Sequence, residues 1–306
     1  MDIAIYGKII IDDIGLAGGS TVAGVLGGGG PQAVFGARLW GATVGLLSRA
    51  GMDLLHRHQT ELAALGADLS GVALYPDLPT FTAPVSASDM DQPPARRTSP
   101  EIAWDRMLGR PLALPVSYEA AQLVHLITEY AAEPMVASAL DLRTRHGATL
   151  SVEPLIGTSG SSDRSAMESL FASSDLVTPD WPSATAFADS DDPRGVIDYW
   201  SRLGPRLVAV RHAEHGSYVW CRDQNRAWHV PAVQVEEVVD PTGAGNAYGG
   251  GLCAGWLAAG NGFAAGAYAA VSASFLLEQP GVPALAAAQA AAKRRLSALV
   301  ADITEL

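Results

Sequence analysis

Short apolar runs alternate with stretches of helical spacing along most of the 306-residue chain. Strand-like runs are predicted at residues 2–6, 9–11, 42–47, 148–152, 175–178, 206–211 and 233–239. Helical spacing predicts helices at residues 33–40, 54–65, 119–130, 163–172, 193–203, 245–259, 263–277 and 284–302. Strands that alternate with helices indicate an α/β fold, with a mostly parallel central sheet covered by helices on both faces.

Residues 72–111 interrupt this alternation. They hold seven prolines in 40 positions, together with several short strand-like pieces. Because proline confines strands to the edges of sheets, this segment is expected to lie outside the central sheet as a small lid. The predicted organisation is an α/β core made of residues 1–71 and 112–306, with residues 72–111 as a lid excursion.

The composition excludes several classes of protein. Hydrophobic residues make up 48% and charged residues 17% of the chain, which is enough apolar material for a core and excludes a disordered protein. The net charge of −12 repels a nucleic-acid backbone, so nucleic acid is not expected as a partner. The negative net charge does not exclude a phosphate ligand, provided that backbone N–H groups bind it. Lys8 and Lys293 are the only lysines, which nearly rules out a lysine-dependent phosphate clamp.

The chain carries no pattern of a secreted or membrane protein. Cys221 and Cys253 lie too far apart in sequence for a disulfide framework or a zinc site, which indicates a reducing compartment. Asp2 stands where a secretory signal would carry positive charge. Residues 241–277 contain no charged side chain, but residues 260–262 split them into halves too short to span a bilayer. We therefore expect two buried helices there and a cytoplasmic protein without membrane attachment.

The segment Val238–Gly251, with the sequence VVDPTGAGNAYGGG, carries the most chemical information. A buried strand is predicted to run into glycines that open a helix. Glycine lets the backbone approach a ligand closely, and the first turn of a helix offers unpaired N–H groups at its positive end. This pattern predicts an anion site. It fits neither a P-loop, which needs a lysine, nor a dinucleotide fingerprint, which needs an acid between Asn246 and Glu278.

The segment Asp240–Asn246 resembles the C-terminal signature of the PfkB (ribokinase-like) carbohydrate kinase family, Asp-x-Thr-Gly-Ala-Gly-Asp, in six of seven positions. The resemblance extends over nearly the whole chain. Its other parts are Gly7–Asp12, the glycine run Gly27–Gly30 with the helix after it, the proline-rich lid, Arg211–Gly216 in place of the nucleotide loop Thr-Leu-Gly-x-x-Gly, and Ala270–Pro283. It implies a ribokinase-like three-layer α/β/α fold with a small β lid.

The same resemblance implies ATP-dependent phosphoryl transfer to a hydroxyl of a sugar, nucleoside or related small molecule, with Mg²⁺ and K⁺ as further cofactors and a homodimer as the candidate assembly. Asn246 stands at the general-base position, and the backbone of Gly243, Ala244 and Gly245 would form the anion hole. The remaining implied roles are substrate binding by Asp12, Gly28, Gly29 and Gly30, nucleotide binding by Ala213, Gly216 and Thr242, a monovalent cation at Asp240, and magnesium at Asp180.

Several positions depart from the family pattern. Asn246 replaces the aspartate base, Pro31 replaces a substrate-binding asparagine, Ala213 replaces a glycine, and Asp180–Ser183 stands in for the Asn-x-x-Glu motif. This combination is similar to a divergent branch that includes the fungal maintenance-of-killer protein. An amide is not a base. The sequence therefore leaves two functions open, a kinase and a nucleotide- or polyol-binding protein that no longer transfers phosphate.

Plainer structural roles stay open for the same residues. Asp12 could cap a turn, Asp240 could interact with a helix dipole, and Asp180 could be a turn residue. His212 and His215 lie in a predicted turn after a strand without a visible third ligand, which favours an ordinary turn over a zinc site.

Overall fold

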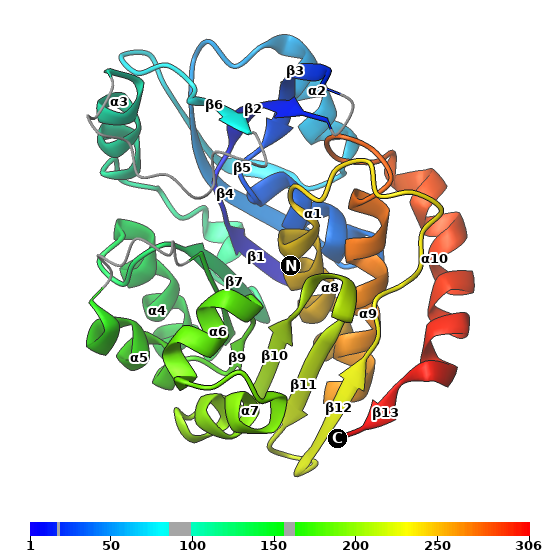
Figure 1. The fold of residues 1–306 in the computed structure, drawn as a ribbon. Helices are drawn as coiled ribbons and strands as arrows, with labels where there is room; N and C mark the ends of the chain where they lie inside the picture. The colour runs from blue at the N-terminus through cyan, green and yellow to red at the C-terminus, as the bar shows by residue number, and fades with distance from the viewer. Residues whose placement is uncertain (17–18, 86–98, 156–162) are drawn as a thin grey trace.

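A computed structural model describes residues 1–16, 19–85, 99–155 and 163–306, and a ten-stranded sheet forms the centre of this part (Figure 1). In spatial order the strands are β13 (Thr304–Glu305), β12 (Arg226–Val230), β11 (Ser217–Cys221), β10 (Leu207–Arg211), β9 (Leu176–Val177), β8 (Thr149–Pro154), β7 (Leu123–Thr128), β1 (Ile3–Tyr6), β4 (Val44–Gly51) and β5 (Asp68–Tyr75). Neighbours from β10 to β5 pair in parallel, and neighbours from β10 to β13 pair antiparallel. The mostly parallel sheet is confirmed.

Helices cover both faces of this sheet. Because alternate residues of a strand point to opposite faces, β1 sends Ile3 and Ile5 into one core and Ala4 and Tyr6 into the other. The first core includes residues of α1 (Gly30–Arg38), α2 (His56–Ala64), α8 (Ala244–Ala259), α9 (Gly262–Leu276) and α10 (Leu285–Leu299). The second includes residues of α4 (Pro134–His146), α5 (Arg164–Ala172), α6 (Trp181–Ala188) and α7 (Pro193–Arg202). The predicted three layers are therefore present.

A second sheet has three strands in the order β3-β2-β6 and lies at the top of the view in Figure 1. β2 (Ile10–Gly15) pairs antiparallel with β3 (Thr21–Gly27) and parallel with β6 (Thr82–Val85). We expected the small sheet to come from residues 72–111, but only β6 lies there. That expectation was wrong because strand β3, which contains two glycines, gives a weak strand pattern. β6 is an edge strand that contains Pro84, as the proline rule requires.

The other described residues of the proline-rich segment do not belong to the three-stranded sheet. β5 carries the central sheet as far as Tyr75, and α3 (Ser99–Leu108) is a helix where no helix was predicted. Residues 86–98, which belong to the predicted lid, lie outside the described residues.

Two elements predicted from the sequence are wrong. The helix expected at residues 119–130 is replaced by β7, whose six residues are all buried between β1 and β8. A short apolar run fits a buried strand and a helix equally well, and pairing on both sides decides the outcome. The strand expected at residues 233–239 is an irregular segment, in which Val238 is 58% exposed. The N–H groups of Val239 and Asp240 both donate to the carbonyl of Leu277, at 2.7 and 3.2 Å.

The uncharged stretch 241–277 forms α8 and α9, which pack against each other as predicted. Close approach is needed there, because a Cβ placed on Gly255 would lie 2.8 Å from the Cα of Ala265. Within the described ranges, none of the helices is long and apolar enough to cross a bilayer. Single-turn 3₁₀ helices occur at η2 (Val116–Tyr118), η3 (Ala213–His215) and η4 (Val300–Asp302).

Candidate active site

The glycine turn before α1 and the first turn of α8 meet at the carboxyl edge of the parallel strands. An isolated bridge pairs Lys8, just beyond the end of β1, with Gly29. A Cβ placed on Gly29 would lie 2.9 Å from Asn246 Nδ2, and one placed on Gly243 would lie 2.5 Å from Gln32 Cγ. The two glycine-rich segments, more than 200 positions apart in sequence, are therefore in contact. Ligands of open α/β sheets bind at this edge.

Asp12 reaches the same turn from β2. Its carboxylate lies against Gly27, where an added Cβ would be 1.7 Å from Asp12 Oδ2. Asp12 is only 2% exposed, and its Oδ1 has no hydrogen-bond partner. Burial, followed by the charges of Asp240 and Asp13, raises the pKa of Asp12 to about 7. The negative charge of Asp240 thus disfavours ionisation of Asp12.

Asp240 is 3% exposed and stands just before the first turn of α8. Its Oδ1 accepts a hydrogen bond from the N–H of Thr242 at 2.9 Å, and its Oδ2 is buried without a partner. A buried carboxylate oxygen without a donor is costly. The unpartnered oxygens of Asp12 and Asp240 therefore fit a bound cation or substrate hydroxyls.

The first turn of α8 supplies free backbone donors. Gly243, with φ of +79°, is the N-cap residue. The N–H of Ala244 donates to the carbonyl of Pro241 at 3.2 Å, so it is partly engaged. The N–H groups of Gly245 and Asn246 have no acceptor within the described part of the chain. Of the three residues expected to form an anion hole, Gly243 and Gly245 have N–H groups without an acceptor in the described part of the chain, and Asn246 adds a third.

A buried polar network that the sequence did not reveal lies behind this turn. Glu153, at the end of β8, is fully buried. Its Oε1 accepts hydrogen bonds from Asn246 Nδ2 at 2.9 Å and from Arg211 Nη1 at 2.7 Å. Its Oε2 lies 3.2 Å from His125 Nε2. The one signal in the sequence was the position of Glu153, an acidic residue directly after the strand predicted at residues 148–152.

His125 completes the network from β7. Burial lowers its pKa, but Cys253 and the Glu153 carboxylate outweigh burial and raise the pKa of His125 to about 10. Gly249 leaves room for this cluster, because a Cβ there would lie 2.4 Å from Glu153 Oε2. Both oxygens of Glu153 are thus held by donors.

The predicted nucleotide loop follows β10 as the single turn η3. Ala213 has a φ of +44°, a conformation that favours glycine. Gly216 has a φ of +83°, and a Cβ there would lie 2.2 Å from the carbonyl oxygen of Val230. The loop therefore keeps glycine-type geometry at both positions where the family pattern has glycine.

Asp180 is the N-cap of α6. Its Oδ1 accepts a hydrogen bond from the N–H of Ser183 at 3.0 Å. A backbone bridge joins Asp180 to Arg211, so this helix start borders the nucleotide loop. Trp181 stacks on His212 with ring centroids 4.0 Å apart. Among the described residues, no group of three or more His, Cys, Asp or Glu side chains is placed to hold a metal ion.

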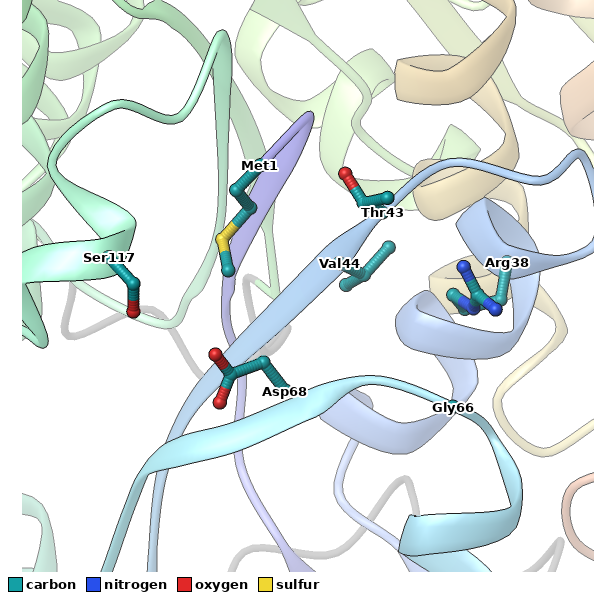
Figure 2. Close-up of a pocket in the computed structure, with 7 residues that line it drawn as sticks. All are labelled: Met1, Arg38, Thr43, Val44, Gly66, Asp68 and Ser117. Atoms are coloured by element: carbon teal, nitrogen blue, oxygen red, sulfur yellow. The ribbon is translucent and has the colours of Figure 1, made fainter.

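A shallow cavity of about 380 Å³ lies elsewhere on the molecule (Figure 2). It is lined by Met1, Arg38, Thr43, Val44, Gly66, Asp68 and Ser117. These residues surround the amino ends of β1, β4 and β5, which form the opposite edge from the glycine turns. This cavity is therefore separate from the candidate site.

The model of the family described as "pfkB family carbohydrate kinase" matches residues 2–288. The chain belongs to the pfkB family. The pfkB kinases are phosphotransferases that act on hydroxyl acceptors, and this protein is classed with them. The cytidine kinase of Thermococcus kodakarensis is 24% identical over 258 residues, which cover 84% of this chain and 88% of that protein.

Solved structures of pfkB-type proteins share the fold. The adenosine kinase of Sinorhizobium meliloti matches with a TM-score of 0.74 and 18% identity, over 96% of this chain and 98% of that one. A double mutant of the fructokinase of Vibrio cholerae, bound to fructose, ADP and potassium ion, matches with a TM-score of 0.72 and 19% identity, over 95% and 98% of the two chains. These likenesses confirm the ribokinase-like fold.

Proposed function

We propose that this pfkB protein transfers the terminal phosphoryl group of Mg·ATP to a hydroxyl of a sugar, nucleoside or related small molecule. The observation that carries the proposal is the meeting of Asp12, the glycine turn and Asn246 at the first turn of α8. Phosphoryl transfer needs positioning and charge stabilisation more than covalent chemistry, and this edge of the sheet offers both.

The phosphoryl group would lie at the first turn of α8. The free N–H groups of Gly245 and Asn246 point to an anion there, and the positive end of the helix dipole adds to them. Such preorganised donors stabilise charge that develops in the transition state. The turn containing Ala213 and Gly216, together with Thr242, would hold the rest of the nucleotide.

The acceptor would lie between Asp12 and Asn246. Asp12 has an unpartnered oxygen that can accept hydrogen bonds from hydroxyls, and the glycine at position 29 keeps side-chain atoms away from Asn246. Asn246 gives its Nδ2 to Glu153, so its Oδ1 is left to orient an acceptor hydroxyl. Asp240 Oδ2, also unpartnered, would hold a monovalent cation beside the anion hole.

The relatives support these assignments for nucleotide, cation and acceptor class. The fructokinase structure contains ADP, potassium ion and a sugar, and the relatives named for cytidine and adenosine act on nucleosides. A suitable acceptor panel therefore contains cytidine, adenosine and fructose.

The alternative is a nucleotide- or polyol-binding protein without transfer activity. Asn246 favours it, because the amide at the general-base position cannot accept a proton. Loss of a general base slows a reaction by about 10²–10⁴-fold.

Two measurements on the wild-type protein separate these functions. ATP or ADP with magnesium and potassium should raise the melting temperature, because a ligand that binds only the folded state stabilises it. Gly245→Val should abolish the rise, because the new side chain would occupy the space of the Arg211 guanidinium and block the first turn of α8. Consumption of ATP with an acceptor supports the kinase. Binding without consumption supports the alternative, and no shift with any nucleotide contradicts the kinase and leaves polyol binding as the remaining form of the alternative.

A further inference from the structure

Arg211 is the cationic side chain that lies against the expected anion hole. A Cβ placed on Gly245 would lie 2.3 Å from Arg211 Nη1, so the guanidinium borders the free N–H groups of the first turn of α8. The side chain is 12% exposed. Glu153 Oε1 holds Nη1 at 2.7 Å, and Nε is buried without a hydrogen-bond partner. The guanidinium is therefore fixed at one nitrogen and keeps unused donors.

The surrounding side chains leave Arg211 as the available positive charge. Asp12 and Asp240 are acidic, and Glu153 is already bound to Arg211. Lys8 is 6% exposed and pairs with Glu129 and with Glu133, the latter at 3.5 Å. In the described ranges, Arg211 is thus the one Arg or Lys side chain found next to the α8 signature glycines. A nucleotide brings several negative charges to this place, which need a counter-charge.

We propose that Arg211 binds the terminal phosphate of the nucleotide and that Glu153 is the positioning residue that holds its guanidinium in place. This inference rests on the proposed function and assigns one of its binding residues. The nucleotide loop of the family pattern has threonine where this chain has Arg211, so the positive charge is a departure from that pattern. Nη1 is the guanidinium nitrogen that lies nearest to Gly245, and beyond its bond to Glu153 it keeps a second N–H that can donate to a phosphate oxygen.

The consequence for the reaction is electrostatic. A positive charge beside the migrating phosphoryl group stabilises the charge on its oxygens in the transition state. Glu153 fixes that charge before the nucleotide arrives, so less ordering is needed on binding. No proton or covalent bond of Arg211 changes during transfer.

The test is a series of calorimetric titrations with adenosine, AMP, ADP and a non-hydrolysable ATP analogue, all with magnesium. For Arg211→Gln we expect a loss of affinity for the ATP analogue of about 10- to 100-fold, from the loss of charge-assisted hydrogen bonds, with adenosine bound as by wild type. Arg211→Lys should lose less. Arg206→Gln is the matched control, because Arg206 precedes the same strand, is 46% exposed and pairs with Asp223. It should bind every probe as wild type does.

Removal of Arg211 alone leaves Glu153 buried with one cation fewer, which can prevent folding. The double variant Arg211→Gln with Glu153→Gln removes both charges and keeps the test decisive, with the same expected loss for the ATP analogue. Equal losses for adenosine and the ATP analogue, or no loss for either, would overturn the inference. If the wild-type protein binds neither adenosine nor the ATP analogue, the proposed function fails as well. If the wild-type protein binds the ATP analogue and the Arg211 variants bind it with the same affinity, the proposed function stands and the inference falls.

Discussion

Asn246 donates a hydrogen bond from Nδ2 to Oε1 of the buried Glu153, over 2.9 Å. A carboxylate can only accept, so the bond determines which end of the Asn246 amide faces the network. Oδ1 is then the end available to a substrate hydroxyl. In the proposed active site, Asn246 can therefore align an acceptor hydroxyl, but its amide cannot take the proton.

This contact predicts that restoring the base requires two changes. In Asn246→Asp, the new carboxylate would face Glu153 across about 3 Å, and two carboxylates that close do not both ionise. When Asn246→Asp is combined with Glu153→Gln, the hydrogen bond is kept with its direction reversed. The amide at position 153 then donates to the carboxylate at position 246. Because Glu153 also holds Arg211, we compare the double variant with Glu153→Gln alone, over which we expect turnover to increase by about 10²-fold, the low end of a general-base contribution. Asn246→Asp should gain less over wild type.

The measurement for these variants is ATP consumption with the best acceptor of the panel. Turnover of the single variant equal to that of the double variant would contradict the repulsion argument. Negligible turnover in both, with nucleotide bound, would mean that Pro31 or the Asp180–Ser183 segment has already removed the reaction.

The buried Asp12 predicts a stability change that depends on pH. Its pKa is about 7 in the folded protein and 3.8 in the reference state, so the folded state holds the proton more tightly. Ionisation of Asp12 therefore destabilises the fold progressively as the pH rises from about 4 to about 7. Asp12→Asn should increase the free energy of unfolding at pH 8 by about 1–3 kcal/mol and leave it nearly unchanged at pH 4. Urea unfolding of wild type and variant at pH 4 and pH 8, in potassium-free buffer, measures these changes in the free energy of unfolding. An equal increase at the two pH values would show that ionisation of Asp12 is not the cause.

The left-handed backbone of Ala213 predicts a stabilising glycine. With φ at +44°, the Cβ of Ala213 is strained, and Ala213→Gly should stabilise the protein by about 0.5–1 kcal/mol after the entropy of the unfolded chain is counted. The matched control is Ala290→Gly, at an exposed position inside α10, which should destabilise by about 1 kcal/mol. In chemical denaturation, the free energy of unfolding should increase for Ala213→Gly and decrease for Ala290→Gly. A decrease for both variants would show that Ala213 is not strained.

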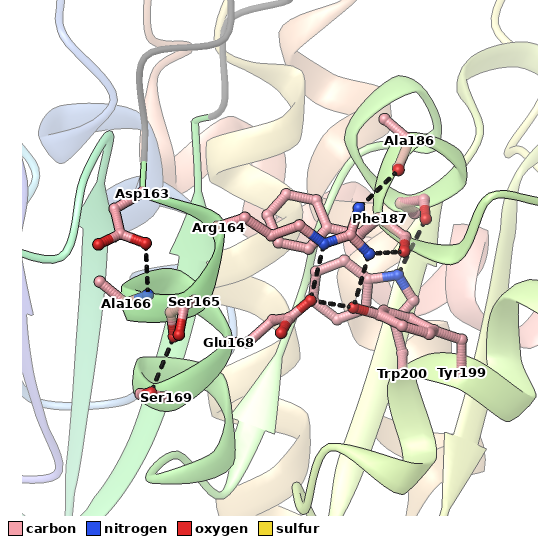
Figure 3. A network of polar contacts seen from close by, with 11 residues as sticks. Asp163, Arg164, Ser165, Ala166, Glu168, Ser169, Ala186, Phe187, Tyr199 and Trp200 are labelled. Carbon is pink, nitrogen blue, oxygen red and sulfur yellow. Dashed lines mark hydrogen bonds and ion pairs between the residues drawn. The ribbon is translucent and has the colours of Figure 1, made fainter.

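Arg164 joins helices α5, α6 and α7 at the end of α6 opposite to Asp180 (Figure 3). Its guanidinium bonds Glu168 Oε1 at 2.8 Å on α5, the carbonyls of Ala186 and Phe187 at the end of α6, and the hydroxyl of Tyr199 on α7. A cation at the end of a helix also interacts favourably with its dipole.

Arg164→Ala should therefore destabilise the protein by about 1–2 kcal/mol and leave nucleotide affinity unchanged. Arg202→Ala is the control, because Arg202 is 76% exposed and makes one pair with Asp198. It should change stability by less than about 0.5 kcal/mol. A similar effect of both substitutions on the melting temperature would count against the bridging role.

The sequence predicted the elements whose patterns are local. The central strands β1, β8 and β10 and the helices α8 and α9 follow directly from apolar runs and small-residue helical spacing. β7 and β3 could not be recognised in that way, because a buried apolar run is ambiguous and β3 gains its order from pairing with β2. Tertiary pairing overrides local pattern in both cases.

The candidate site was predictable where a motif carried it. The signature around Asn246 and the glycines near Asp12 were identified as parts of one site, and the structure brings them into contact. Glu153 and His125 could not be found, because a single acid or histidine in an apolar strand does not reveal its partners on other strands. Their roles arise from the packing of β7, β8 and α8.

The most direct test of the proposed kinase is ³¹P NMR of the wild-type protein with Mg·ATP, potassium and each acceptor in turn. We predict a phosphate-ester resonance with at least one acceptor, growing in step with ADP, because in the proposed site the first turn of α8 would hold the phosphoryl group beside an aligned hydroxyl. ATP that stays intact with every acceptor, or that yields only inorganic phosphate, would contradict it.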